Sequence, residues 1–140
     1  MKQTDNFKFD EANVMNELVY RNLSEDAKRQ ICAWKYGGEY DLYNLPAYEE
    51  MQVRQIGFMN PQREKNYYGF WDESILVGFV NILEEKEEIF IGIGVNPELQ
   101  GGNYEIYANR EKTAIDLCDY SIRNHICNGT SDVVWLWKRS

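Results

Sequence analysis

One stretch of this chain, residues 88–105, constrains the fold more strongly than any other. It opens with β-branched and aromatic residues, which favour a strand over residues 89–95. Gly92 and Gly94 interrupt this strand, and glycines inside a strand indicate either a β-bulge or a close approach of a ligand to the backbone. The residue before Pro97 is pushed out of the helical region, so the strand must end in a turn.

A glycine-rich loop, residues 100–103, follows the turn and reads Gln-Gly-Gly-Asn. A polar helical pattern begins near Tyr104 and extends to about Asn124. Free backbone N–H groups at a helix N-terminus bind phosphate groups with the help of the helix dipole. The order of strand, glycine-rich loop and helix therefore predicts an anion site at the loop.

Composition indicates one globular domain, because 140 residues with 44% hydrophobic content are enough for a core. The 10 Tyr and 4 Trp fit a small core filled by large side chains better than an aromatic ligand platform. A net charge of −8 disfavours nucleic acid and anionic membranes as partners, and we predict neither. The same charge would tolerate a cationic amine substrate.

The cysteines give no metal or redox motif. Cys32, Cys118 and Cys127 are odd in number and lack CxxC spacing, and His125 is the single histidine, so we predict no metal site. The longest apolar run, residues 75–83, is too short to span a membrane, and no signal peptide is visible. The expected location is therefore the reducing cytoplasm.

The remaining patterns predict an α+β domain, residues 17–140, after an N-terminal extension, residues 1–16. A first strand is expected at residues 18–23, a helix from Ser24 to about Gly37, and a short helix from Pro46 to about Gly57. Short turns join three strands into an antiparallel meander, which we expect at residues 67–71, 75–83 and 89–95. The apolar residues 133–137 predict a last strand in the centre of the sheet.

This order of elements resembles that of the GNAT N-acetyltransferase superfamily, and the local sequence is similar as well. Residues 69–80, GFWDESILVGFV, resemble the second and third strands of the family across their tight turn. Residues 91–101, IGIGVNPELQG, resemble the fourth strand as it enters the pyrophosphate loop, and residues 31–46 are similar to the acceptor-side helix region. The likeness covers residues 17–102 by sequence and residues 103–137 by element order.

The resemblance implies a GNAT-like, mixed and mostly antiparallel sheet flanked by helices, with a short C-terminal part. It implies acetyl-CoA as acyl donor and direct attack of a primary amine, either a small molecule or a peptide, on the thioester. A backbone N–H of the fourth strand would polarise the thioester carbonyl. The cofactor-binding residues that it implies are Ile93, Gly94, Val95, Gln100, Gly101, Gly102, Asn103, Tyr104, Glu105 and Ile106. Catalytic residues are not assigned, and Tyr36, Tyr40 and Tyr43 either line the acceptor side or pack in the core.

Three departures from the family pattern support an alternative function. Asn103 and Glu105 stand where the family loop has glycine, and Ile89 stands where some members carry glutamate. The sequence also stops after the fifth expected strand. The alternative is a catalytically impaired GNAT-like binding or interaction module, in which the uncovered edge of residues 133–137 favours a homodimer.

Overall fold

The computed structural model describes residues 18–38, 41, 44–85, 88–99, 106–107 and 109–123, and the backbone of residues 132–137. The strands are β1 (Val19–Asn22), β2 (Tyr67–Asp72), β3 (Ile75–Glu84), β4 (Glu88–Val95) and β5 (Asp132–Trp137). The helices are α1 (Glu25–Ala33), α2 (Tyr48–Arg54) and α3 (Arg110–Arg123), and 3-10 turns lie at Gly57–Met59 and Glu64–Asn66. The expected extension, residues 1–16, lies outside the described residues.

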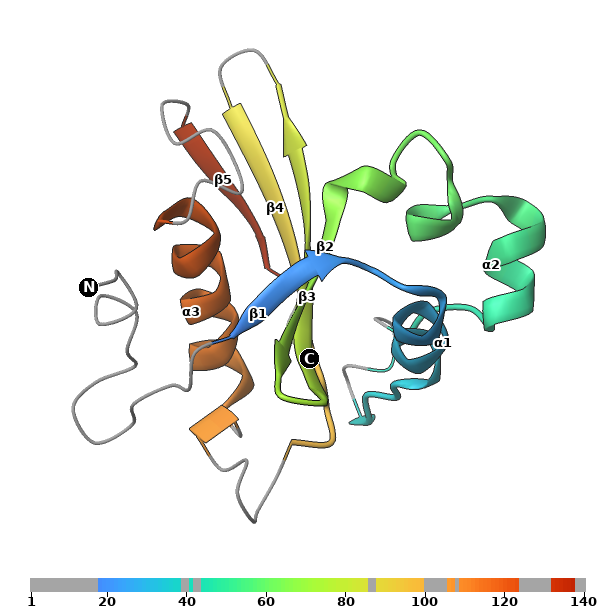
Figure 1. The fold of residues 1–140 in the computed structure, drawn as a ribbon, viewed down its shortest axis with the longest axis horizontal. Coiled ribbons are helices and arrows are strands. Elements are labelled where there is room, and N and C mark those ends of the chain that lie inside the picture. Colours follow the sequence, from blue (N-terminus) through green and yellow to red (C-terminus); the bar gives the residue numbers. More distant parts are fainter. Residues whose placement is uncertain are drawn as a thin grey trace.

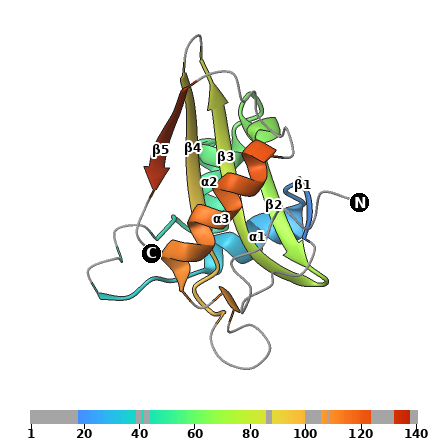
Figure 2. The ribbon, with the colours of Figure 1, turned by 90° about the vertical axis from the view of Figure 1, so that its left-hand side faces the viewer.

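The strands form one sheet in the order β1-β2-β3-β4-β5. The first four strands pair antiparallel with their neighbours, whereas β5 runs parallel to β4. Helix α3 covers one face of the sheet, and α1 and α2 lie on the other (Figures 1 and 2). The predicted α+β class and the antiparallel meander are confirmed, and the fold is GNAT-like in the order of its elements.

Each face of the sheet has its own hydrophobic core. Along β4, alternate residues point to opposite faces, so Ile91 and Ile93 pack toward α3 and contribute to the core that contains Leu117. The opposite core joins α1 and α2 to β2 and β3, and Ile31 and Met51 are buried in it. The period-2 pattern of β4 thus separates a fully apolar face from one that carries Gly92 and Gly94.

Three details differ from the sequence predictions. Strand β5 pairs only with β4 among the described residues, so the expected central position is wrong for this part of the sheet. An apolar run predicts that both faces of a strand are covered, and it says nothing about its edges.

The second difference concerns the β-bulge, which was one of the two alternatives for Gly92 and Gly94. The described bulge lies between Phe70 and Trp71 of β2, where Val77 of β3 is the extra residue. Strand β4 runs through both glycines without a register shift.

The third difference concerns the start of α3, which begins at Arg110 and not at Tyr104. The side-chain Oδ1 of Asn109 accepts a hydrogen bond from the Lys112 N–H at 3.1 Å, and the Asn109 carbonyl accepts one from Thr113 N–H at 2.9 Å. Asn109 is therefore the N-cap. The expected phosphate loop is consequently separated from the helix N-terminus by several residues.

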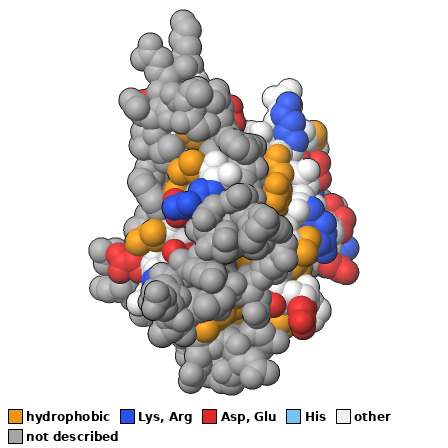
Figure 3. All heavy atoms as spheres, turned by 60° about the vertical axis from the view of Figure 1, so that its left-hand side comes forward, with side chains coloured by type: hydrophobic (Ala, Val, Ile, Leu, Met, Phe, Trp, Pro, Cys, Tyr) orange, Lys and Arg blue, Asp and Glu red, His pale blue; other side chains and the backbone are white. Residues whose placement is uncertain are grey.

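The surface on the α3 side carries hydrophobic, acidic and basic side chains in a mixed pattern among the described residues (Figure 3). Ile115 of α3 is one of the exposed hydrophobic residues on this helix. No helix in the described part of the chain combines the length and the apolar character that crossing a membrane requires.

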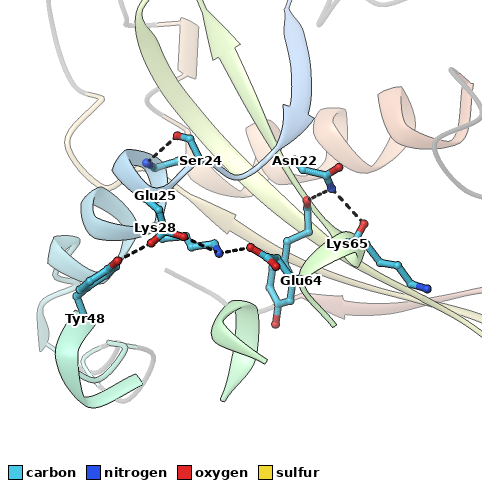
Figure 4. A network of polar contacts seen from close by, with 9 residues as sticks. Asn22, Ser24, Glu25, Lys28, Tyr48, Glu64 and Lys65 are labelled. Carbon is cyan, nitrogen blue, oxygen red and sulfur yellow. Dashed lines mark hydrogen bonds and ion pairs between the residues drawn. The ribbon is translucent and has the colours of Figure 1, made fainter. Parts of the chain in front are cut away.

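A polar network fixes the α1–α2 layer to the sheet (Figure 4). The buried Lys28 ammonium lies 3.2 Å from Glu25 Oε2 and 2.5 Å from Glu64 Oε2, and the Tyr48 hydroxyl donates to Glu25. Burial disfavours the charged ammonium, but the hydrogen bonds to Glu64 and Glu25 outweigh it and raise the pKa of Lys28. The network thereby connects α1, α2 and the turn that leads into β2.

Candidate functional site

The C-terminal end of β4 is the first part of the candidate site. Among the described residues, β5 pairs with β4 only as far as Ile93, which lies opposite Trp137. Gly94 and Val95 continue beyond that pairing and keep their partners on β3. The Asn96 N–H donates to the Val77 carbonyl of β3 at 2.9 Å, and backbone groups alternate along a strand. The N–H and C=O of Val95 therefore point away from β3, toward the side of the sheet on which β5 lies.

A tyrosine from the opposite layer already contacts this backbone. The Tyr36 hydroxyl donates to the Val95 carbonyl at 3.0 Å, and Tyr36 itself is buried. Its backbone N–H donates to Asn44 Oδ1 at 2.6 Å, and the Arg110 guanidinium lies 5.9 Å from the centre of its ring. A carbonyl oxygen has two lone pairs, so Val95 retains the capacity for one further donor.

Gly94 allows a close approach, although not by a ligand. A Cβ at residue 94 would lie 2.3 Å from Phe79 Cε1 and 2.8 Å from Phe79 Cζ. Phe79 is the cross-strand partner of Gly94, and its ring covers the glycine. The sequence pattern indicates that this glycine is either part of a β-bulge or a site of close approach to the backbone. The structure shows a close approach, and the approaching group is an aromatic side chain of the protein itself.

Gly92 has a different role from Gly94. A Cβ at this position would meet only Asn81 Cβ, at 3.8 Å, because the space above it is part of a cavity of about 190 Å³. The cavity lies between β4 and the segment that contains α2 and the turn after it, and Met51 and Phe58 line that side. The missing side chain of Gly92 therefore opens the cavity onto the β4 backbone.

The described lining of this cavity is mostly apolar and aromatic. Phe58, Tyr67 and Phe79 contribute three rings whose centroids lie 5.6 to 6.5 Å apart. The polar side chains of the lining are Tyr67 and Asn81, and none of the described lining residues is charged or a histidine. Burial raises the pKa of the Tyr67 phenol, so this side chain stays neutral at physiological pH.

The chain leaves β4 through a well-defined turn. The Asn96 side chain donates to the Leu76 carbonyl at 3.0 Å and accepts from the Glu98 N–H at 2.9 Å. Both bonds fix the exit direction of the backbone, as the Asn-Pro pair predicts. Leu99, the last described residue of this turn, is buried.

The chain returns to the fold at Tyr107, which is fully buried. Its hydroxyl donates to Asp72 Oδ2 at 2.7 Å, and its carbonyl accepts from the Thr113 hydroxyl at 3.1 Å. Burial, followed by the hydrogen bond to Asp72, strongly raises the pKa of the Tyr107 phenol. Tyr107 thus anchors the C-terminal end of the predicted phosphate loop to the β2–β3 hairpin.

The predicted cofactor residues divide into two groups. Ile93, Gly94 and Val95 lie together at the end of β4 and are buried, and Ile106 packs against the core on the α3 side. The others, residues 100–105, lie outside the described residues, as do Tyr40 and Tyr43. Of the three tyrosines considered for the acceptor side, Tyr36 is thus the one whose position the structure describes.

Sequence reasoning missed Phe79 and the cavity over Gly92, because both depend on which residues face each other across strands. The pairing of Gly94 with an aromatic residue could have been found by fixing the register of the short hairpin first. In the described part of the chain, no group of three or more His, Cys, Asp and Glu side chains is arranged to hold a metal ion.

Comparison with known proteins gives likeness in structure alone. No family model matches the chain, and no curated protein matches it. The chain is similar to a GNAT-family acetyltransferase from Bacillus cereus, with 14% identity over 76% of this chain and 63% of that one and a TM-score of 0.44. It is also similar to a spermidine N-acetyltransferase chimera from Vibrio cholerae and hSSAT, with 19% identity over 63% of this chain and 56% of that one and a TM-score of 0.40. The chain thus matches less than two thirds of the length of either protein.

Proposed function

We propose that this chain binds acetyl-CoA at the end of β4 and transfers its acetyl group to a primary amine. The observation that carries the proposal is the backbone of Gly94 and Val95, which has no β5 partner among the described residues and lies next to a cavity that opens onto the same strand. The pantetheine arm of CoA contains two amides, so it can pair with such a backbone as a short strand.

The chemistry follows from this placement. In this proposal the arm pairs along Val95 and brings the thioester toward Gly92 and Ile93, which line the cavity. An amine in the cavity attacks the carbonyl, the C–N bond forms, the C–S bond breaks, and the amine proton is released while the thiolate takes up a proton. The contribution of the protein is to hold both reactants together and to exclude water.

Two measurements test the proposal on the full chain. Isothermal titration with acetyl-CoA is expected to give micromolar binding, and release of the CoA thiol in the presence of a panel of amines is expected to show turnover. The substitution Val95→Pro removes the N–H that points away from β3, so binding should be lost while the circular dichroism spectrum is retained. The substitution Val53→Thr, at a residue of α2 that is 83% exposed, is the matched control. Absence of acetyl-CoA binding to the wild-type chain would overturn the proposal.

A second candidate function is a GNAT-like binding module without turnover. Two observations favour it: the Tyr36 hydroxyl occupies one lone pair of the Val95 carbonyl, and the described cavity lining contains no carboxylate or histidine that could act as a base. This candidate predicts acetyl-CoA binding with no thiol release for any amine in the panel. Turnover above the uncatalysed rate excludes it.

A further inference from the structure

The cavity over Gly92 indicates which class of acceptor amine the protein uses. This inference rests on the proposed transferase function. Its volume of about 190 Å³ is close to the roughly 150 Å³ of an engineered apolar cavity that binds benzene. A single ring with a short linker therefore fits inside it.

The chemistry of the walls selects against a second charge. Phe58, Tyr67 and Phe79 present rings, Met51 and Leu45 present apolar side chains, and the described lining offers no carboxylate. An ammonium group moved from water into such a cavity loses its hydration without gaining a counterion, which is expensive. The described walls thus offer no counterion to the second ammonium of a diamine or polyamine.

The remaining wall places the reacting nitrogen. Gly92 has no side chain, so the β4 backbone forms this wall of the cavity. The N–H and C=O of Gly92 point toward β3, because Gly92 lies four residues before Asn96, whose N–H donates to β3. The cavity therefore has an apolar end beside α2 and, beside Gly92, an end that the Asn81 side chain borders. An amine with one apolar group matches this arrangement, because one end of the molecule is apolar and the other end is polar.

We infer that the acceptor is a small primary amine that carries one aromatic or branched aliphatic group, which occupies the cavity between α2 and β4 while the nitrogen faces the β4 backbone. The ring edges of Phe58 and Phe79 would contact the apolar group, and the Asn81 side chain borders the nitrogen end. Phenethylamine represents this class, and putrescine represents the diamines that the described walls disfavour.

The first experiment compares the two amines with the wild-type chain at saturating acetyl-CoA. We expect kcat/KM for phenethylamine to exceed that for putrescine at least about tenfold, the discrimination that a hydrophobic pocket can supply. A Cβ at residue 92 meets no atom closer than 3.8 Å, so Gly92→Val should extend into the cavity and raise KM for phenethylamine while leaving the Kd of acetyl-CoA nearly unchanged. Leu45→Glu adds a carboxylate to the lining and should shift the preference toward putrescine. Val53→Thr should change none of these values.

The outcomes separate the two proposals. Turnover of putrescine but not of phenethylamine overturns the substrate class and leaves the transferase function intact. Failure of acetyl-CoA to bind overturns the transferase function, and the cavity is then tested alone by saturation-transfer NMR with phenethylamine. Binding that disappears in Gly92→Val sustains the cavity as a site for this class of amine, and absence of binding to the wild-type chain overturns it.

Discussion

The contact between Gly94 and Phe79 leads to a prediction about stability. In Gly94→Ala the new Cβ would lie 2.3 Å from Phe79 Cε1, whereas carbon atoms in contact prefer about 3.5–4.0 Å. The ring must therefore move by more than about 1 Å. It cannot move freely, because the rings of Trp34, Tyr67 and Phe58 lie within 6.2 to 6.5 Å of its centre.

The magnitude follows from two opposing effects. Overpacking of a core site costs about 1–3 kcal/mol. Replacing glycine by alanine restricts the unfolded chain and returns about 0.4–1 kcal/mol. The middle values of these two ranges leave a net loss of about 1.3 kcal/mol for Gly94→Ala, which lowers the Tm of a domain of this size by roughly 3–6 °C. Thermal unfolding followed by circular dichroism measures it.

Gly92→Ala is the matched control, since Gly92 lies on the same strand and the same face. Its new Cβ would meet only Asn81 Cβ at 3.8 Å, so the variant should be neutral or more stable by up to about 1 kcal/mol. In the double variant Gly94→Ala with Phe79→Leu, the two effects should be non-additive, because the smaller side chain relieves the clash. Equal Tm values for Gly94→Ala and Gly92→Ala would refute the reasoning.

Three further predictions follow. Tyr107→Phe removes a buried hydrogen bond to Asp72 and should lower the free energy of unfolding by about 1.5–3 kcal/mol in urea denaturation, and an unchanged value contradicts the anchoring role. The Tyr48 hydroxyl, followed by Lys28, lowers the pKa of Glu25 from its usual 4.5, so its stabilising contribution is present above that value and is lost as pH falls through the lower folded pKa. Glu25→Gln should therefore flatten the stability profile between about pH 2 and pH 5, and an unchanged slope argues against this pairing. Tyr36→Phe removes the hydrogen bond to the Val95 carbonyl and should lower the free energy of unfolding by about 1 kcal/mol. The same change should lower the Kd of acetyl-CoA in titration calorimetry, because the Val95 carbonyl no longer has a partner within the protein that competes with the ligand. A higher Kd would show that Tyr36 does not compete with acetyl-CoA.

The elements of the fold could be predicted because their signals are local. Ser24 accepts the predicted N-cap hydrogen bond from the Ala27 N–H at 3.1 Å, and the turn at residues 73–74 joins β2 and β3 as expected. The start of α3 could not be predicted in the same way. Asn103 and Asn109 are both suitable N-caps, and the choice of Asn109 accompanies the burial of Tyr107 against Asp72, 35 residues away in the sequence.

The candidate site could be predicted only in part, for the same reason. The local motif at residues 91–101 is sufficient to single out Ile93, Gly94 and Val95 of β4 as candidates. The Tyr36–Val95 hydrogen bond joins residues 59 positions apart, and no local periodicity encodes such a contact. The cavity is less predictable still, because it depends on the absence of a side chain at Gly92 and on apolar side chains from α2, β2 and β3 that meet only after folding.

The two glycines of β4 connect the packing of the fold with its proposed chemistry. Residues two apart on a strand share a face, so Gly92 and Gly94 both point toward the α1–α2 layer. Gly94 lets the Phe79 ring lie across β4, and that ring forms one wall of the cavity, whereas Gly92 leaves the adjoining wall open to the backbone. A side chain at residue 94 would displace a cavity wall, and one at residue 92 would fill the cavity. Both variants should therefore weaken amine binding, but only Gly94→Ala should weaken it together with the stability of the fold.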